Sequence, residues 1–563
     1  MLRSARAAFA LLLVCVGSIF LVPTCLGQAG ADPAKAGSAK LDSAQLGAIR
    51  TYISSAWDTL TRSMADCKTV VDPKLPDATV LYLPAGFDAP AAVQKLQQDC
   101  KVQVKNLPKV LHGPGEVDTS TFTPHGVLYL EHPYVVPGGR FNEMYGWDSY
   151  FIIRGLVRDG RVDLAKGMVD NFFFEIEHYG TFLNANRTYY LTRSQPPFWT
   201  AMVMAVYDAE KAAGKEDKAW LAKAYADTSK DYEMWTREPH RAGLTGLSRY
   251  YDFGDGPAPE SIQDESGEHR QAVAYLSSHP ELAGKYVAAR KDGETGGKFD
   301  PTYTVEVCDA ATTMERPACE PKTSVHLTSE FYKGDRAMRE SGFDVSFRFG
   351  PYGAGTHHFA PVCLNSLLYK TEKDLEVMAR SLGRVREAQE WREKADTRAG
   401  IMRRLFWDAE RGQFLDYDFE AGKRSDYEYD STFYPLWTGW ATPEQARAVE
   451  QHLNVFELAG GIVMSRHEVH TQWDYPNGWA PLQLIAVEGL RNYKFDEDAD
   501  RVSRKFLSTV MENFQRDGTI REKYNMVTRT TDSQVTAGYH MNVIGFGWTN
   551  GVFLVLADGL GGR

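Results

Sequence analysis

The chain repeats one pattern over most of its length, in which a helix-like segment is followed by a loop rich in aromatic and acidic residues and then by another helix-like segment. Strand-like alternation of apolar and polar residues occurs only in short pieces. Paired helices can bury their apolar faces by closing into a ring, with the long loops gathered at one end. We therefore predict an all-α fold. The expected helices are residues 41–64, 91–104, 147–158, 164–179, 196–213, 218–237, 372–382, 386–407, 442–453 and 499–516.

Composition and charge narrow the class of protein. The 563 residues are 43% hydrophobic and 24% charged, which is ordinary for a globular chain. The formal net charge is −11 and no basic tract offsets it, so we expect no nucleic-acid partner. Aromatic residues make up 12% of the chain, which suits either carbohydrate binding or a large helical core. We expect a monomer without a cofactor, and no clustered His or Cys spacing predicts a metal site.

The N-terminus has the pattern of a secretory signal. Residues 1–27 contain Arg3 and Arg6, then an apolar run, then small residues suited to cleavage. This pattern predicts a periplasmic or secreted protein that has no membrane contact after cleavage. One alternative is a lipoprotein anchored at Cys25. An uncleaved membrane helix is a weaker alternative, because Pro23 cuts the apolar run short of a full span.

The rest of the chain is expected to form one domain. Residues 28–40 are rich in Ala, Gly, Asp and Lys and predict a flexible leader. Residues 41–563 then form a single domain. Within it, a stretch at about 250–322 is rich in Gly, Pro, Asp and Glu, and we interpret it as a loop-rich insertion over the loop end of the ring.

Five cysteines remain after the predicted signal. An exported protein would meet an oxidising compartment, where disulfides form. From their proximity in the sequence we predict the pairs Cys67–Cys100 and Cys308–Cys319, each closing a short irregular segment. Cys363 is then expected to be buried and unpaired.

The stretch 137–150, PGGRFNEMYGWDSY, is unlike a core helix. Its proline and adjacent glycines break the chain and allow turns with positive φ. Arg140 and Asp148 then stand among four aromatic residues, one of which is Trp147. Rings can stack on the apolar faces of a sugar while charged groups hydrogen-bond its hydroxyls. The stretch therefore indicates a sugar pocket, although a glycine-rich turn leading into an amphipathic helix is the simpler alternative.

A second stretch, 472–481, reads QWDYPNGWAP and has the same chemistry. The two stretches closely resemble the signature motifs of the family 37 glycoside hydrolases, the trehalases. Further similar stretches extend from about Asp66 to Gly551, including DCKT at 66–69 and GFGWTNG at 545–551. The resemblance implies an (α/α)6 barrel with its site at the loop end. It also implies inverting hydrolysis of α,α-trehalose to two glucose molecules, without a cofactor.

Glycosidic bond cleavage usually takes one carboxyl group that protonates the leaving oxygen and a second that activates water. Placement in loops beside glycine and aromatic residues selects five acids, Asp148, Glu260, Asp344, Asp474 and Glu522. Residues 339–344, RESGFD, resemble the family stretch that holds the general acid, which implies this role for Asp344. Residues 521–524, REKY, resemble the stretch with the general base, which implies Glu522. Each has a simpler alternative: for Asp344 an acid in the turn after a helix, and for Glu522 a surface ion pair with Lys523.

The predicted acid should lie among apolar rings with a raised pKa, and the predicted base should stay ionised, helped by a nearby arginine. For substrate binding the resemblance implies ten further residues, of which Trp473 and Trp548 have core packing as the alternative. The predicted binding residues are Arg140, Trp147, Asp148, Asn184, Arg193, Gln195, Glu260, Trp473, Asp474 and Trp548.

Two departures from the family pattern weaken the inference to trehalose. Where the family has arginine in a short RPE sequence, this chain has Ala258. Residues 536–544, TAGYHMNVI, lack the glycine-rich run and the glutamate that the family carries there. The alternatives are therefore an inverting hydrolase of another α-glucoside, such as kojibiose or nigerose, or a catalytically inactive sugar-binding protein.

Overall fold

Six helices form a closed inner ring in the computed structural model. The structure describes residues 41–71, 79–262, 267–291, 293–294, 296–297, 300–305, 323–532, 535, 537–538 and 541–561. Each inner helix contacts the next, and the last contacts the first. In order, the inner helices are α5 (Gly146–Arg158), α7 (Trp199–Ala212), α13 (Val362–Ser381), α15 (Tyr434–Thr438), α17 (Ala480–Asn492) and α19 (Gly547–Gly561).

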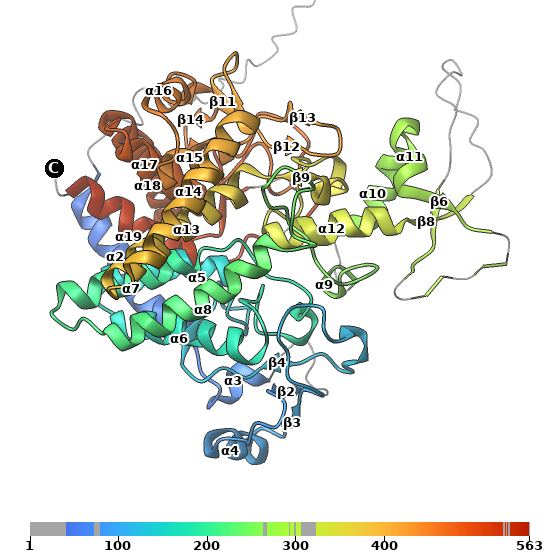
Figure 1. The fold of residues 1–563 in the computed structure, drawn as a ribbon, viewed down its shortest axis with the longest axis horizontal. Coiled ribbons are helices and arrows are strands. Elements are labelled where there is room, and N and C mark those ends of the chain that lie inside the picture. The colour runs from blue at the N-terminus through green and yellow to red at the C-terminus, as the bar shows by residue number, and fades with distance from the viewer. Residues whose placement is uncertain are drawn as a thin grey trace, which may run out of the picture.

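A second layer of helices covers the ring from outside, which makes the fold an all-α (α/α)6 barrel, as predicted (Figure 1). These outer helices are amphipathic, with apolar residues toward the inner ring and charged residues toward solvent. They are α2 (Ser43–Leu60), α6 (Val162–His178), α8 (Lys218–Thr236), α14 (Val385–Phe406), α16 (Pro443–Gln451) and α18 (Asp496–Asp517).

The ring closes between α5 and α19, which approach most closely where Gly155 faces Gly551. A Cβ atom placed on Gly155 would lie 2.4 Å from Cα of Gly551, and one on Gly551 would lie 2.1 Å from the carbonyl oxygen of Phe151. Only glycine allows this approach, because any side chain would overlap the facing backbone.

Small pieces of sheet lie outside the barrel helices. One three-stranded sheet joins β2 (Val80–Leu83) in parallel to β3 (Gln103–Asn106) and β4 (Val127–Leu128), with Leu81 opposite both Val104 and Val127. The helix expected at 91–104 ends earlier, as α4 (Ala91–Asp99), because the following residues form β3. Shorter elements here are α3 (Cys67–Val70), η1 (Thr119–Thr121), η2 (Thr188–Tyr190) and the pair β1 (Thr61–Arg62) with β5 (Tyr134–Val135).

The expected insertion contains more regular structure than its composition indicated. It projects from the barrel beside α12 (Ser329–Ser341) (Figure 1). Its antiparallel sheet has the order β6–β8–β7. The elements are α9 (Pro259–Ile262), α10 (Glu268–Ser277), α11 (Pro280–Tyr286), β6 (Val287–Ala289), β7 (Tyr303–Val305) and β8 (Thr323–Leu327).

The remaining short elements connect the barrel helices. Among them, β16 (Asn477–Trp479) pairs with β17 (Lys523–Asn525) and so holds the second motif beside the predicted base. The others are η3 (Pro351–Gly353), η4 (Thr356–His358), β9 (Phe359–Ala360), β10 (Trp407–Asp408), β11 (Gln413–Phe414), β12 (Tyr417–Asp418), β13 (Lys423–Arg424), η5 (Asp430–Phe433), η6 (Leu453–Val455), β14 (Glu457–Leu458) and β15 (Gly461–Ile462).

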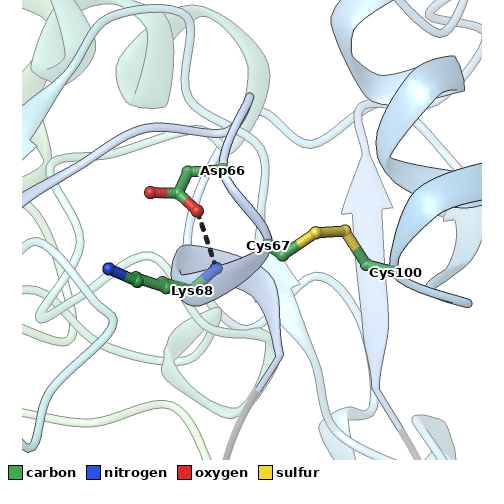
Figure 2. The surroundings of a disulfide bond; sticks show 4 residues. All are labelled: Asp66, Cys67, Lys68 and Cys100. Carbon is green, nitrogen blue, oxygen red and sulfur yellow. Dashed lines mark hydrogen bonds between the residues drawn. A yellow bond between two sulfur atoms is a disulfide. The ribbon is translucent and has the colours of Figure 1, made fainter.

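The cysteines bear out two of the three expectations. A disulfide joins Cys67 in α3 to Cys100 at the end of α4, beside the turn in which Asp66 accepts a hydrogen bond from the Lys68 amide (Figure 2). Cys363 is buried and unpaired. The predicted pair Cys308–Cys319, like the predicted signal and leader, lies outside the described residues. Among the helices that are described, none combines the length and apolar character needed to cross a membrane.

Candidate active site

The residues chosen from the sequence meet at one end of the barrel, where the inner helices begin. Trp147 and Asp148 stand in the first turn of α5, and Trp548 stands in the first turn of α19. Asp344 follows α12, and Glu522 directly precedes β17. Segments separated by up to about 400 residues therefore supply one site because the ring closes.

Asp344 lies in the turn after α12, three residues beyond its last residue. Gly342 ends the helix with a positive φ of 76° and allows the chain to turn. The Asp344 side chain keeps an exposed fraction of 36%, and Oδ2 lies 3.9 Å from Nη1 of Arg339. Burial raises the pKa of Asp344 to about 6, against the opposing influence of the Arg339 and Arg193 guanidinium groups. A carboxyl group with this pKa can carry a proton in mildly acidic solution.

Glu522 is held by its backbone, and its side chain has an exposed fraction of 1%. Its amide donates to the carbonyl oxygen of Val543 (3.1 Å) and to Oδ1 of Asn542 (3.2 Å), and its carbonyl oxygen accepts from Nε1 of Trp548 (3.2 Å). Nζ of Lys523 lies 4.0 Å from Oε2. Both side chains are buried, so the alternative of a surface ion pair between them is wrong.

Asp148 and Lys523 connect the two predicted catalytic acids electrostatically. Burial raises the pKa of Asp148 well above its ordinary value, and the charges of Glu522 and Asp344 raise it further. Burial lowers the pKa of Lys523, while Glu522 and Asp344 act in the opposite direction and Arg140 lowers it further. Because these charges shift the pKa values of Asp148 and Lys523, the five charged groups named here lie close together in one site.

The three predicted tryptophans form one aromatic cluster. The ring centroids of Trp147 lie 5.7 Å from Trp473 and 5.8 Å from Trp548, and Trp479 stacks on Trp473 at 3.9 Å. Phe343, the neighbour of Asp344, packs against Trp473 at 5.3 Å. Trp147, Trp473 and Trp548 have exposed fractions of only 2–3%, so most of each ring packs inside the protein. The cluster therefore places apolar rings next to Phe343, the neighbour of Asp344, and at the starts of α5 and α19.

Arg193 is the centre of a buried polar network. Its Nε donates to Oδ1 of Asn184 (2.7 Å), and Nη2 pairs with Glu260. Nη1 lies 3.5 Å from Oδ2 of Asp252, which also accepts from Nη1 of Arg336 at 3.0 Å. Three of the predicted binding residues therefore contact one another directly.

Two further predicted binding residues also make contacts within the protein. Oε1 of Gln195 accepts a hydrogen bond from the amide of Trp147 at 2.9 Å. Asp474 is fully buried and accepts from the Tyr427 hydroxyl (2.7 Å) and from the Phe347 amide (2.9 Å), among others. Oε1 of Gln195 and the Asp474 carboxylate are therefore engaged by groups of the protein itself. Arg140 is half-buried, with its guanidinium over its neighbouring phenylalanine ring.

Sequence reasoning passed over several residues that the structure places at the site. Gln472 and Arg339 lie inside the recognised motifs, so their signal was available. Nε2 of Gln472 donates to the carbonyl oxygen of Asp344, and its Oε1 accepts from Nζ of Lys523 at 3.2 Å. Asp252 had no such signal, because it acts on residues distant in the sequence. Asn542 lies in the stretch 536–544, which was noted only for the residues that it lacks.

The structure describes Ala258 and, within the second departure, residues 537–538 and 541–544. Ala258 is fully buried, and the backbone before it is held by Arg336, which donates to the carbonyl oxygens of Gly256 (2.7 Å) and Pro257 (3.1 Å). In the second departure, Asn542 binds both amides of the Glu522–Lys523 pair through Oδ1 at 3.2 Å.

Comparison with known proteins gives one consistent result. The family model described as "Trehalase" matches residues 38–292 and 301–561. A probable trehalase of Eremothecium gossypii is 36% identical over 89% of this chain and 71% of its own length. A cytosolic neutral trehalase of Saccharomyces cerevisiae is 36% identical over 76% of this chain and 56% of its own length. The solved structure of neutral trehalase Nth1 from Saccharomyces cerevisiae superposes with a TM-score of 0.71 and 29% identity, covering 92% of this chain and 94% of that one.

The same comparisons correct the predicted location. Several of the matched relatives are named cytosolic neutral trehalases, among them those of Saccharomyces cerevisiae and Beauveria bassiana. The predicted periplasmic or secreted location is therefore wrong. A basic and apolar N-terminus is a short compositional pattern, and composition alone does not decide whether a chain is exported. The chain also spans little more than half the length of several of these relatives.

Proposed function

Because this chain belongs to the trehalase family and is a glycoside hydrolase of the trehalase type, we propose that it hydrolyses α,α-trehalose to two glucose molecules with inversion at the attacked carbon. Asp344 is the general acid and Glu522 is the general base. One observation carries these roles. Asp344 and Glu522 come from separate loops, yet the charge of each raises the pKa of the same third carboxyl, Asp148, and Asp344 itself has a pKa of about 6.

The environments of the two acids fit different tasks. Asp344 is partly open, sits beside Phe343 and is protonated more readily than an ordinary aspartate, so it can donate a proton to the leaving oxygen. Glu522 is fixed by backbone hydrogen bonds and lies near the cationic Nζ of Lys523. A fixed carboxylate close to a positive charge can accept a proton from an attacking water.

The remaining groups hold the sugar and the acids in place. Arg193 and Arg339 both act on the Asp344 carboxyl, since each lowers its pKa against the effect of burial. The same guanidinium groups carry donors suited to sugar hydroxyls. Gln472 holds the Asp344 backbone and the Lys523 ammonium at once, which couples the acid side of the site to the base side.

Proton NMR of the purified protein with trehalose tests the proposal directly. Inversion releases one α-glucose as the leaving group and one β-glucose from the attacked ring, so both anomers should appear in equal amounts before mutarotation. Only α-glucose at the outset would mean retention and would overturn the assigned roles.

The same experiment on kojibiose and nigerose separates the substrates. Ala258 and the altered stretch 536–544 make these other α-glucosides the relevant comparison. A clear preference for either one would retain a glycoside hydrolase but reject trehalose as its substrate. Asp344→Asn and Glu522→Gln should each abolish hydrolysis of trehalose while sugar binding remains. Normal hydrolysis in either variant would reject that residue's role.

A further inference from the structure

A second group of ionisable side chains lies away from the active site, at the start of α12. Glu330 belongs to the first turn of this helix, and His357 and His358 form the end of η4, which packs against the same helix. One potential ligand atom from each residue lies within 4.8 Å of the others. Nε2 of His358 is 2.6 Å from Oε1 of Glu330, and Nε2 of His357 is 3.2 Å from the same oxygen.

We propose that Glu330, His357 and His358 bind one divalent metal ion, for which zinc is the best match. Two imidazoles and one carboxylate form a donor set that zinc accepts, with metal–ligand distances of about 2.0–2.2 Å. In a tetrahedral site those distances place neighbouring ligand atoms about 3.3 Å apart. The separation of 3.2 Å between Nε2 of His357 and Oε1 of Glu330 matches this geometry, whereas the 2.6 Å between Nε2 of His358 and the same oxygen must widen when the ion binds. Three protein ligands leave the fourth position of a tetrahedral site for water.

The hydrogen bonding of His357 is the second observation that points to a ligand. Its side chain has an exposed fraction of 5%, yet within the described ranges neither ring nitrogen has a partner in hydrogen-bond geometry, and the contact of Nε2 is the 3.2 Å ion pair with Oε1 of Glu330. Leaving a buried polar group without a partner costs free energy. A metal ion bound at Nε2 would satisfy this nitrogen.

His358 is already oriented as a metal ligand would be. Its Nδ1 lies 2.8 Å from Oε1 of Glu420, in the turn between β12 and β13. This contact is an ion pair without hydrogen-bond geometry, and Nε2 now bonds Oε1 of Glu330 at 2.6 Å. A carboxylate close to one ring nitrogen favours the proton there, which would leave the lone pair of the other nitrogen for the metal. The backbone of the histidine pair is fixed as well, because Nη1 of Arg249 donates to the carbonyl oxygen of His357 at 2.9 Å.

Lys285 at the end of α11 currently supplies the positive charge of this cluster. Its Nζ lies 3.2 Å from Nε2 of His358 and 3.4 Å from Oε1 of Glu330. The side chain has an exposed fraction of 46%, so it can swing into solvent when a metal ion binds. Lys285 and the ion therefore compete for the same two ligand atoms.

Such a metal would be structural. It would link the start of α12 to η4, and through Glu420 to the β12–β13 turn. Asp344 lies beyond the opposite end of α12, a helix of 13 residues and therefore about 20 Å long. Sequence spacing gave no sign of the site, because the two histidines are adjacent and Glu330 stands 28 residues before His358.

The test uses the full-length protein without a histidine tag, stripped with EDTA and dialysed. Zinc chloride is then titrated in a calorimeter, and the metal content is measured after gel filtration. We expect one zinc per chain and a higher Tm with zinc. Glu330→Gln and His357→Ala should lose both effects, while the exposed control His112→Ala should keep them.

Lys285→Ala gives an independent result in the opposite direction. Removing a competing, partly exposed cation should tighten zinc binding up to about fivefold, the equivalent of about 1 kcal/mol. Circular dichroism checks that each variant is folded. Absence of stoichiometric zinc in the wild type, or equal binding in folded Glu330→Gln, would overturn the proposal. If Lys285→Ala binds zinc as well as the wild type or more weakly, Lys285 does not compete with the ion, and the ion is not bound at Glu330 and His358.

Discussion

The catalytic efficiency on trehalose should fall as pH rises from 5 to 7, because the proposed acid loses its proton in this range. The structure gives Asp344 a pKa of about 6. A group with that pKa is about 90% protonated at pH 5 and about 10% protonated at pH 7, so kcat/KM should fall about tenfold. The sign follows from the role: a general acid works only in its protonated form, so activity is present below the pKa and lost above it.

The quantity to measure is kcat/KM from initial rates of glucose release, because this ratio reports the ionisation of the free enzyme. The matched control is α-glucosyl fluoride, whose leaving group departs without needing a proton. Deprotonation of Asp344 should therefore not lower kcat/KM for the fluoride between pH 5 and 7. For the same reason Asp344→Asn should lose trehalose hydrolysis by about 10²–10⁴-fold and retain most of its activity on the fluoride.

Two results would refute this reasoning. A flat kcat/KM for trehalose over this range would mean that Asp344 does not titrate as the structure indicates. An equally large fall in kcat/KM for α-glucosyl fluoride between pH 5 and 7, whether with the wild type or with Asp344→Asn, would mean that the ionisation of another group limits the rate. In either case the acid would have to be sought among the other carboxyl groups of the site, beginning with Asp148, whose pKa burial also raises.

Three further substitutions test the support of the site. Asp252→Asn removes the carboxylate that pairs with Arg193 in a fully buried position, so the free energy of unfolding measured in urea should fall by about 3–5 kcal/mol; an unchanged midpoint would contradict this pairing. Cys67→Ser opens a disulfide between residues 33 apart and should lower stability by about 3–4 kcal/mol, an effect that a reducing agent should reproduce in the wild type but not in the variant. Asn542→Ala removes the side chain that holds the amide of Glu522 and should lower kcat about tenfold with little change in Tm; a loss of Tm with normal kcat would assign Asn542 a purely structural role.

The sequence predicted the outer helices better than the inner ones, and burial explains the difference. The helix expected at 386–407 is α14 (Val385–Phe406), and the one expected at 442–453 is α16 (Pro443–Gln451), which Thr442 and Gln445 start with a capping box. These helices have one polar face, so the apolar residues recur with helical spacing. By contrast, the sequence did not predict α17 and α19. Most of their residues are buried, so no polar face alternates with an apolar face at the helical spacing of 3.6 residues.

The residues of the candidate site likewise fall into those that the sequence revealed and those that it did not. Motifs carried Asp344, Glu522 and the tryptophans, since a motif preserves residues that are close in the sequence. Asp252 and Asn542 could not be found in this way, because their partners lie at Arg193 and Arg336 in one case and at Glu522 in the other. Their contribution exists only after the loops meet.

Closure of the ring is the physical reason that one site can draw on both ends of the chain. The glycine contact between α5 and α19 lets these helices lie side by side, although about 400 residues separate them. It brings Trp548 to 5.8 Å from Trp147, and the Trp548 indole then donates to the carbonyl oxygen of Glu522. Any side chain larger than hydrogen at Gly551 would push α19 outward and move that indole. Such a change would thereby displace the proposed base without touching it, so activity should fall before the barrel unfolds.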